Sequence, residues 1–170
     1  FAKQLCAQFT EQEKLQIDSI NSVIKSKTSH DTSKASAYVL LSEFLGPSNM
    51  DTVIYLCTQA QKIAEKNLTK NPNKLEEKSF KLSLAAALNN IGYVYMDKSN
   101  YTVALEYYFK GNEVELSNNN RQGLASGYNN IGLIYYDLGD IPLALEYYEK
   151  SLKIKEEFND RKGMAFSFNN

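Results

Sequence analysis

The sequence predicts an all-α fold, an α-solenoid built from stacked helical hairpins. Three observations lead to this prediction. A block of 40 residues recurs along the chain, apolar side chains within each block recur at spacings of three and four, and only three prolines and eight glycines occur in 170 residues. This spacing marks one buried helix face. Paired helices that repeat in this way bury their apolar faces by stacking on their neighbours.

The composition is that of an ordinary globular chain, 43% hydrophobic and 23% charged. Such a chain is too apolar to be disordered. Nineteen basic and twenty acidic side chains leave a net charge of −1, so no global field attracts nucleic acid or anionic lipid. The apolar runs are only a few residues long, which predicts no membrane contact. Two cysteines and the single His30 predict no zinc site, and we expect no metal and no cofactor.

Residues 1–33 form an N-terminal segment that does not share the repeat. Two interpretations of its beginning stay open. Cys6-Ala7-Gln8 matches the small-residue cleavage pattern at the end of a signal peptide, which would make the chain periplasmic or extracytoplasmic. Alternatively, these residues belong to an ordinary first helix of a cytoplasmic protein. Thr10-Glu11-Gln12-Glu13 then has capping-box spacing, which predicts a helix over about residues 10–26 packed on the end of the stack.

A degenerate first copy of the repeat, with an insertion, is expected in residues 34–84. At an offset of 51 residues, five positions fall on the later pattern in order: Leu40, Phe44, Val53, Cys57 and Ala60 on Ile91, Tyr95, Ala104, Tyr108 and Gly111. The eleven residues beyond the 40-residue period are placed near Lys66–Lys74, where Asn71-Pro72-Asn73 marks a loop. Cys57 is expected to be a small buried hydrophobe.

Two clean copies follow in residues 85–124 and 125–164, and a truncated further copy begins in residues 165–170. When residues 88–130 are placed on residues 128–170, 18 of the 43 positions are identical. In the second clean copy, helices are predicted over 124–136 and 141–154. Between them, Gly139 suits a positive φ, and Asp140 suits the N-cap of the second helix.

Gly92 and Gly132 lie in the middle of predicted helices, where glycine costs about 1 kcal/mol relative to alanine. We expect close approach of the paired second helix, through Ala104 and Ala144, to offset that cost. Four tyrosines recur at matching positions and are expected in the core rather than in a ligand cage. These are Tyr95, Tyr108, Tyr135 and Tyr148.

This pattern resembles the tetratricopeptide repeat, a helix–turn–helix unit. Asn130-Ile131-Gly132 with Tyr135, followed by Ala144 and Tyr148, carries the resemblance, and the preceding copy repeats it. The 40-residue period is similar to the longer subclass found in kinesin light chains and many bacterial signalling proteins. The resemblance implies a right-handed superhelix whose first helices line a concave, ligand-binding face.

The resemblance also implies which residues line that face. They are Asn89, Asn90, Tyr93, Met96, Asp97, Ser126, Asn129, Asn130, Leu133, Tyr136 and Asp137. Asparagine suits the role because its amide pairs with both backbone groups of a peptide. The basic residues that would clamp a C-terminal carboxylate are missing. Asp97 and Asp137 favour a neutral or basic ligand instead.

No phosphate loop, metalloprotease motif or nucleophile elbow is present, so we expect no enzyme. We expect a non-catalytic module that binds a protein or peptide, and not nucleic acid. The arrangement resembles the N-terminal sensory region of bacterial signal-transduction proteins such as histidine kinases and nucleotide cyclases. A cytosolic adaptor or scaffold and a peptide-pheromone receptor are the alternatives. An exposed final helix would also allow a homodimer.

Overall fold

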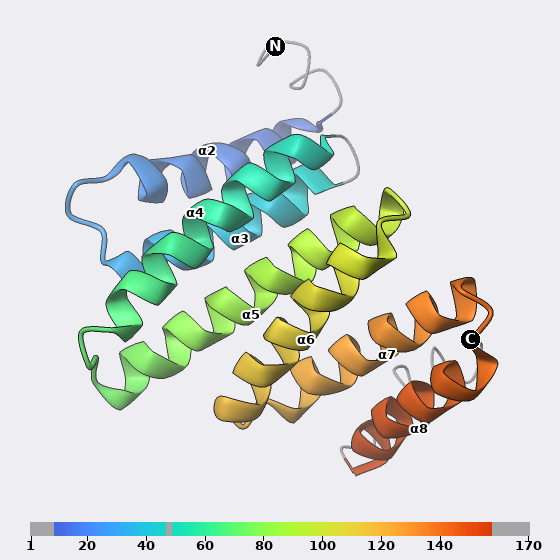
Figure 1. Ribbon diagram of the computed structural model, residues 1–170. Coiled ribbons are helices and arrows are strands. Elements are labelled where there is room, and N and C mark those ends of the chain that lie inside the picture. Colours follow the sequence, from blue (N-terminus) through green and yellow to red (C-terminus); the bar gives the residue numbers. More distant parts are fainter. Residues whose placement is uncertain (1–8, 47–48, 158–170) are drawn as a thin grey trace.

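Seven α-helices make up the part of the chain that the computed structural model describes, residues 9–46 and 49–157. They are α2 (Glu11–Lys25), α3 (Asp31–Leu45), α4 (Met50–Leu68), α5 (Lys74–Asp97), α6 (Tyr101–Ser117), α7 (Arg121–Asp137) and α8 (Ile141–Glu157). Helices α3–α4, α5–α6 and α7–α8 form three hairpins that follow one another across Figure 1. The prediction of an all-α solenoid is confirmed. The further copy expected at residues 165–170 lies outside the described residues.

Asparagine is frequent in this chain partly because it starts the helices. Asn49, Asn73, Asn100 and Asn120 are the N-caps of α4 to α7, and each side chain accepts a hydrogen bond from a backbone N–H of the first turn. These bonds satisfy donors that the helix itself leaves unpaired. Gly139 has φ +79°, and Asp140 accepts a bond from the Leu143 amide at 3.2 Å, as the sequence predicts for the turn before α8.

Helix α2 covers the N-terminal end of the stack. It begins at a capping box in which Thr10 and Glu13 bond each other's backbone amides, close to the predicted start. Ile17, Ile20 and Ile24 pack against Leu41 and Leu45 of α3. No residue of α2 is fully buried, so this helix adds one apolar stripe to the stack without entering its core.

The inserted residues lengthen a helix as well as a loop. Helix α5 has 24 residues and α7 has 17. At the 40-residue period, the first residue of α7 corresponds to Lys81, whereas α5 already begins at Lys74. The insertion therefore adds about two turns to the start of α5. The expected boundary between residues 84 and 85 lies inside this helix.

The register expected for the first copy needs a correction of one residue in its first helix. Leu40, which was placed on Ile91, is 45% exposed, whereas Leu41 is 6% exposed. The first helix therefore matches α5 at an offset of 50. The offset of 51 holds for α4. In this register α3 ends two residues earlier than α5 does, and the connection that follows α3 is one residue longer than the one that follows α5, so the first hairpin is one residue shorter overall. In the corrected register, Ser42 corresponds to Gly92 and Glu43 to Tyr93.

The two helical glycines allow a tyrosine ring to lie directly on the first helix. A Cβ atom on Gly132 would lie 2.8 Å from the Tyr148 ring and 3.2 Å from the Ala144 carbonyl oxygen. A Cβ atom on Gly92 would lie 3.0 to 3.2 Å from the Tyr108 ring. The expected close approach is present, but its main partner is tyrosine, and alanine contributes only through the Ala144 backbone.

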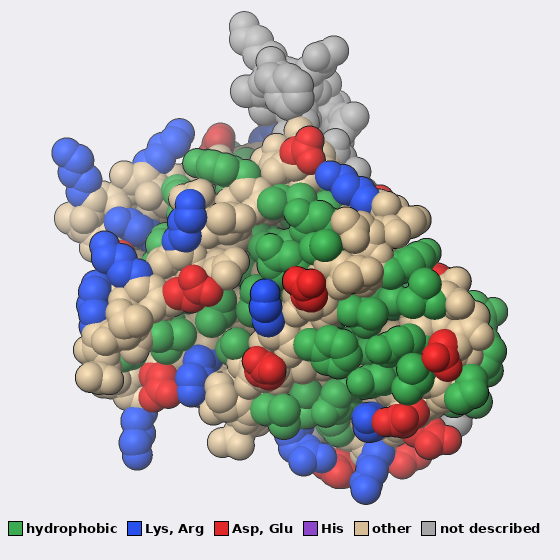
Figure 2. All heavy atoms as spheres, in the orientation of Figure 1, with side chains coloured by type: hydrophobic (Ala, Val, Ile, Leu, Met, Phe, Trp, Pro, Cys, Tyr) green, Lys and Arg blue, Asp and Glu red, His purple; other side chains and the backbone are tan. Residues whose placement is uncertain are grey.

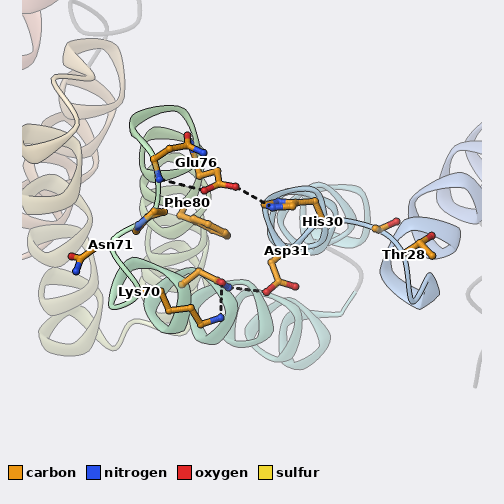
Figure 3. A pocket seen from close by; sticks show the side chains of 11 residues that line it. Thr28, His30, Asp31, Lys70, Asn71, Glu76 and Phe80 are labelled. Atoms are coloured by element: carbon orange, nitrogen blue, oxygen red, sulfur yellow. Dashed lines mark hydrogen bonds and ion pairs between the residues drawn. The ribbon is translucent and has the colours of Figure 1, made fainter.

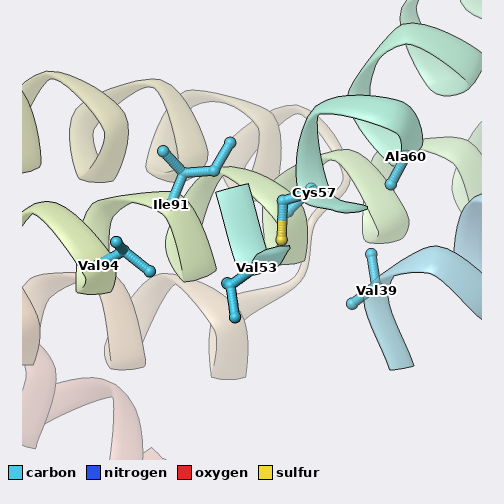
Figure 4. Packing of buried hydrophobic residues seen from close by; sticks show 7 residues of the cluster. Val39, Val53, Cys57, Ala60, Ile91 and Val94 are labelled. Carbon is cyan, nitrogen blue, oxygen red and sulfur yellow. The ribbon is translucent and has the colours of Figure 1, made fainter. Parts of the chain in front are cut away.

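The core consists of small clusters at the contacts between helices. Figure 4 shows one of them, in which Val39 of α3, Val53 and Cys57 of α4, and Ile91 and Val94 of α5 come together. Helices α3 and α5 are thus joined through α4 as well as directly.

The four repeated tyrosines divide into two kinds. Tyr108 is 0% exposed and Tyr148 is 6% exposed, so both belong to the core as predicted. Tyr95 and Tyr135 are half-buried. Each stacks on another tyrosine of the second helix in its hairpin, with ring centroids 5.7 Å and 5.6 Å apart. Such stacked pairs stabilise the hairpin beyond the area they bury.

One surface of the molecule remains strongly apolar. In the view of Figure 2, hydrophobic side chains gather over the side occupied by α6, α7 and α8. Ile141 and Leu145 of α8 are 45% and 55% exposed, while their counterparts Tyr101 and Leu105 pack against Ile131 and Ile134 of α7. Among the described helices, none is both long and apolar enough to cross a bilayer.

Replacement of Gly132 by alanine should destabilise the fold although alanine favours helix by about 1 kcal/mol. The new methyl group would press on the Tyr148 ring, and overpacking of this kind typically costs about 1–3 kcal/mol. Urea unfolding followed by circular dichroism measures the change. Gly92→Ala should lose less, because its neighbours are farther away.

The control is Ser126→Ala, an exposed site on the same helix, which should stay within about 0.5 kcal/mol of the unchanged chain. A Gly132→Ala variant as stable as this control would contradict close packing.

Candidate functional site

The first helices of the hairpins lie on the inner side of the stack. Helix α3 contacts α5 directly, and α5 contacts α7, whereas the second helices α4, α6 and α8 make at most marginal contact with one another. The hairpins therefore spread apart along their second helices. The surface formed by α3, α5 and α7 is called the inner face below.

The sequence-predicted site residues divide into three groups by exposure. The exposed ones are Tyr93, Asp97, Ser126, Tyr136 and Asp137. The half-buried ones are Asn89, Asn90, Met96, Asn130 and Leu133. The third group is Asn129 alone, which is 3% exposed.

In each of the pairs Asn89-Asn90 and Asn129-Asn130, the first asparagine packs against the neighbouring helix instead of facing a ligand. Burial removes Asn129 from the residues that a ligand can reach. The Asn89 Oδ1 atom is buried and faces α6, where a Cβ atom on Gly111 would lie 2.9 Å from it. The ladder of doubled amides expected along the face is therefore a ladder of single amides, Asn90 and Asn130. The sequence does not show which asparagine of a pair is buried, because the two are identical side chains at adjacent positions of one helix.

Asn90 is held by a hydrogen-bond network that sequence analysis missed. The Ser42 hydroxyl donates to the Val39 carbonyl oxygen at 2.6 Å. Its oxygen accepts from the Asn90 Nδ2 atom at 3.1 Å and from the Cys57 thiol at 3.2 Å. Because the hydroxyl proton is already used, the oxygen can only accept here. This fixes the Asn90 amide with its nitrogen toward Ser42 and leaves its Oδ1 as an available acceptor.

A pocket of about 310 Å³ lies next to this network. It is lined by residues from the end of α3 and its C-cap, the beginning of α4 and the last third of α5: Ser42, Glu43, Gly46, Met50, Val53, Asn90, Tyr93 and Val94. Two of the predicted site residues, Asn90 and Tyr93, are among them. Glu43 and Met50 were missed, although the corrected register places Glu43 at the position of Tyr93.

Burial raises the pKa of the Cys57 thiol to about 11, an effect that its hydrogen bonds to Ser42 and Asn90 partly oppose. At neutral pH the group is therefore a protonated donor. This agrees with the expected role of a small buried hydrophobe and makes the thiol a poor nucleophile.

A larger pocket, about 540 Å³, lies at the opposite ends of these helices, where the α2–α3 and α4–α5 connections meet (Figure 3). The His30 Nε2 atom lies 3.1 Å from Glu76, and Asn67 donates to Asp31 at 2.9 Å. Lys70 donates to Asn67 at 3.0 Å. These polar groups satisfy one another, so they tie the two connections together. His30, expected at the surface, also caps α3.

No group of three or more His, Cys, Asp or Glu side chains in the described part of the chain is arranged to hold a metal ion.

Comparison with known proteins finds a family model that matches the second and third hairpins. Residues 83–157 match the family model described as tetratricopeptide repeat. Among solved structures, the chain is similar to the crystal structure of BtubC (BKLC) from P. vanneervenii, with 22% sequence identity and a TM-score of 0.66. The match covers 85% of this chain and 55% of that one. The chain thus spans little more than half the length of that structure, and the likeness concerns the fold. No curated protein matches the chain.

The raised pKa of Cys57 predicts a specific loss of stability in alkali. Below about pH 9 the thiol is protonated in the folded and unfolded chains alike. Between about pH 9 and pH 11 only the unfolded chain releases the proton, so the free energy of unfolding should fall with rising pH. Relative to Cys57→Ala, the loss should reach about 2–3 kcal/mol. Urea unfolding at intervals of one pH unit measures it, and parallel pH curves for the two proteins would refute the burial of this thiol.

Proposed function

Residues 83–157 are tetratricopeptide repeats, and from this premise we propose that the inner face binds an extended peptide segment of a protein partner. Such repeats indicate a protein–protein interaction module. The proposal adds the face and the kind of ligand, and it includes no catalytic step, cofactor or metal.

The observation that carries the proposal is a pair of exposed tyrosines on successive first helices. Tyr93 of α5 is 48% exposed and Tyr136 of α7 is 53% exposed. Tyrosine provides a large contact area together with a hydroxyl group, and it is enriched among residues that dominate binding energy. Two such side chains on successive first helices suit a ligand long enough to touch both hairpins.

Other polar groups on the same two helices suit a peptide backbone. Asn90 and Asn130 are half-buried. An asparagine amide has two donors and an acceptor, and in Asn90 one of the donors is used by Ser42. Asp97 and Asp137 are exposed on the same helices, so the face favours neutral or basic segments. None of the eleven sequence-predicted residues is basic, which argues against capture of a C-terminal carboxylate.

The proposal also has a cellular context. We place the module in the sensory or interaction region of a larger bacterial signal-transduction protein, in contrast to an adaptor or a pheromone receptor. The complete coding sequence tests this part. A downstream membrane span and output domain support it, and a gene that encodes only repeats would argue for a scaffold.

Selection of random 12-residue peptides displayed on phage should enrich sequences that bind the chain. Fluorescence anisotropy of the enriched peptides then compares variants. The double variant Tyr93→Ala/Tyr136→Ala should weaken binding by at least about tenfold, because truncation of a central aromatic anchor commonly costs more than 1 kcal/mol. The matched control is Tyr55→Ala, which changes a 60% exposed tyrosine of the second helix α4. Equal weakening by the control, or no enrichment, would overturn the proposal.

A further inference from the structure

The 310 Å³ pocket between α3, α4 and α5 has a lining that suits one kind of ligand side chain. We propose that it receives the side chain of a lysine or arginine of the bound peptide. This inference rests on the proposed function and adds a specificity to it.

The walls of the pocket suit an aliphatic stem. Met50 and Val53 of α4 and Val94 of α5 provide apolar surface, and Tyr93 adds its ring. Lysine and arginine bury their methylene stems against such surfaces while their charged ends reach polar groups. The volume of about 310 Å³ is at the lower limit of ligand pockets, which fits one long side chain better than a whole small molecule.

The polar groups at this pocket accept hydrogen bonds. The Asn90 Nδ2 atom faces Ser42, to which one of its N–H groups donates, and the Oδ1 atom is the acceptor that this amide offers to a ligand. The Ser42 hydroxyl donates to Val39 and already accepts from Asn90 and Cys57, so it offers a ligand neither a donor nor an acceptor. Glu43 adds a carboxylate, which is an acceptor when ionised. Ammonium and guanidinium groups carry only donors, so they complement this arrangement.

The charge of the pocket also favours a cationic side chain. Among the described residues, Glu43 is the one charged residue that lines the pocket. It is exposed, and it takes part in none of the ion pairs between described residues. An acidic ligand side chain would meet this carboxylate and be repelled. An apolar one would cover Glu43 and the Asn90 carbonyl without giving either a partner, which is costly.

Three pools of fluorescent octapeptides, acetylated and amidated at their ends, test the inference. They share one random mixture of uncharged residues and differ only in a fixed central residue: arginine, norleucine or glutamate. Anisotropy should show that the arginine pool binds the unchanged chain most tightly. Glu43→Gln should weaken that pool by roughly twofold to fivefold, in the range of an exposed ion pair, and leave the norleucine pool unchanged. Glu43→Lys should shift the preference to the glutamate pool.

The matched control is Glu149→Gln, which removes an exposed carboxylate from the second helix α8 and should change none of the three affinities. Circular dichroism melting shows whether each variant is folded. Binding of all pools with equal affinity, or an arginine preference that survives Glu43→Gln, would overturn the inference and leave the proposed function standing. Absence of binding by every pool would overturn both.

Discussion

The contact between a helical glycine and a tyrosine ring determines the geometry of the two well-formed hairpins. In both, the ring of the second helix lies where a Cβ atom of the first helix would be, at Gly92 under Tyr108 and at Gly132 under Tyr148. The ring is buried, so the hairpin gains a large apolar contact at a cost of about 1 kcal/mol for helical glycine. Tyr93, the residue after Gly92, does not take part in this contact and is 48% exposed.

In the first hairpin, two small side chains occupy the positions of the glycine and the tyrosine ring. The candidate pocket is lined by one of them, Ser42. Ser42 stands where the later hairpin has Gly92, and Cys57 stands where it has Tyr108. The two side chains bond to each other instead of packing as ring on glycine. The hydroxyl oxygen keeps a second accepting position, which Asn90 of the next hairpin uses. A change within one hairpin thereby fixes the orientation of an amide in its neighbour.

The sequence predicts what is periodic or local in this fold. The hairpins, the helix α2 with its capping box, and the turn at Gly139 and Asp140 all follow from spacing and short-range chemistry. The one-residue shift in α3 does not, because the residue that the first hairpin lacks is lost where α3 ends, and this leaves no trace in the apolar pattern of either helix. The burial of Asn129 and the bond between Asn90 and Ser42 also escape prediction. They depend on which side of a helix faces its neighbour and on residues 48 positions apart.

A chain with a net charge of only −1 can still discriminate between charged ligands, because the local arrangement matters more than the sum. Many basic side chains are engaged elsewhere: Lys98 pairs with Asp51, and Lys150 lies over the Tyr147 ring. The carboxylates of Glu43, Asp97 and Asp137 stand on first helices. Charges separated by more than about 8–10 Å are largely screened at physiological salt, so a ligand on the inner face interacts mainly with these near groups. Selectivity for charge on such a surface therefore comes from contact within a pocket and not from long-range attraction.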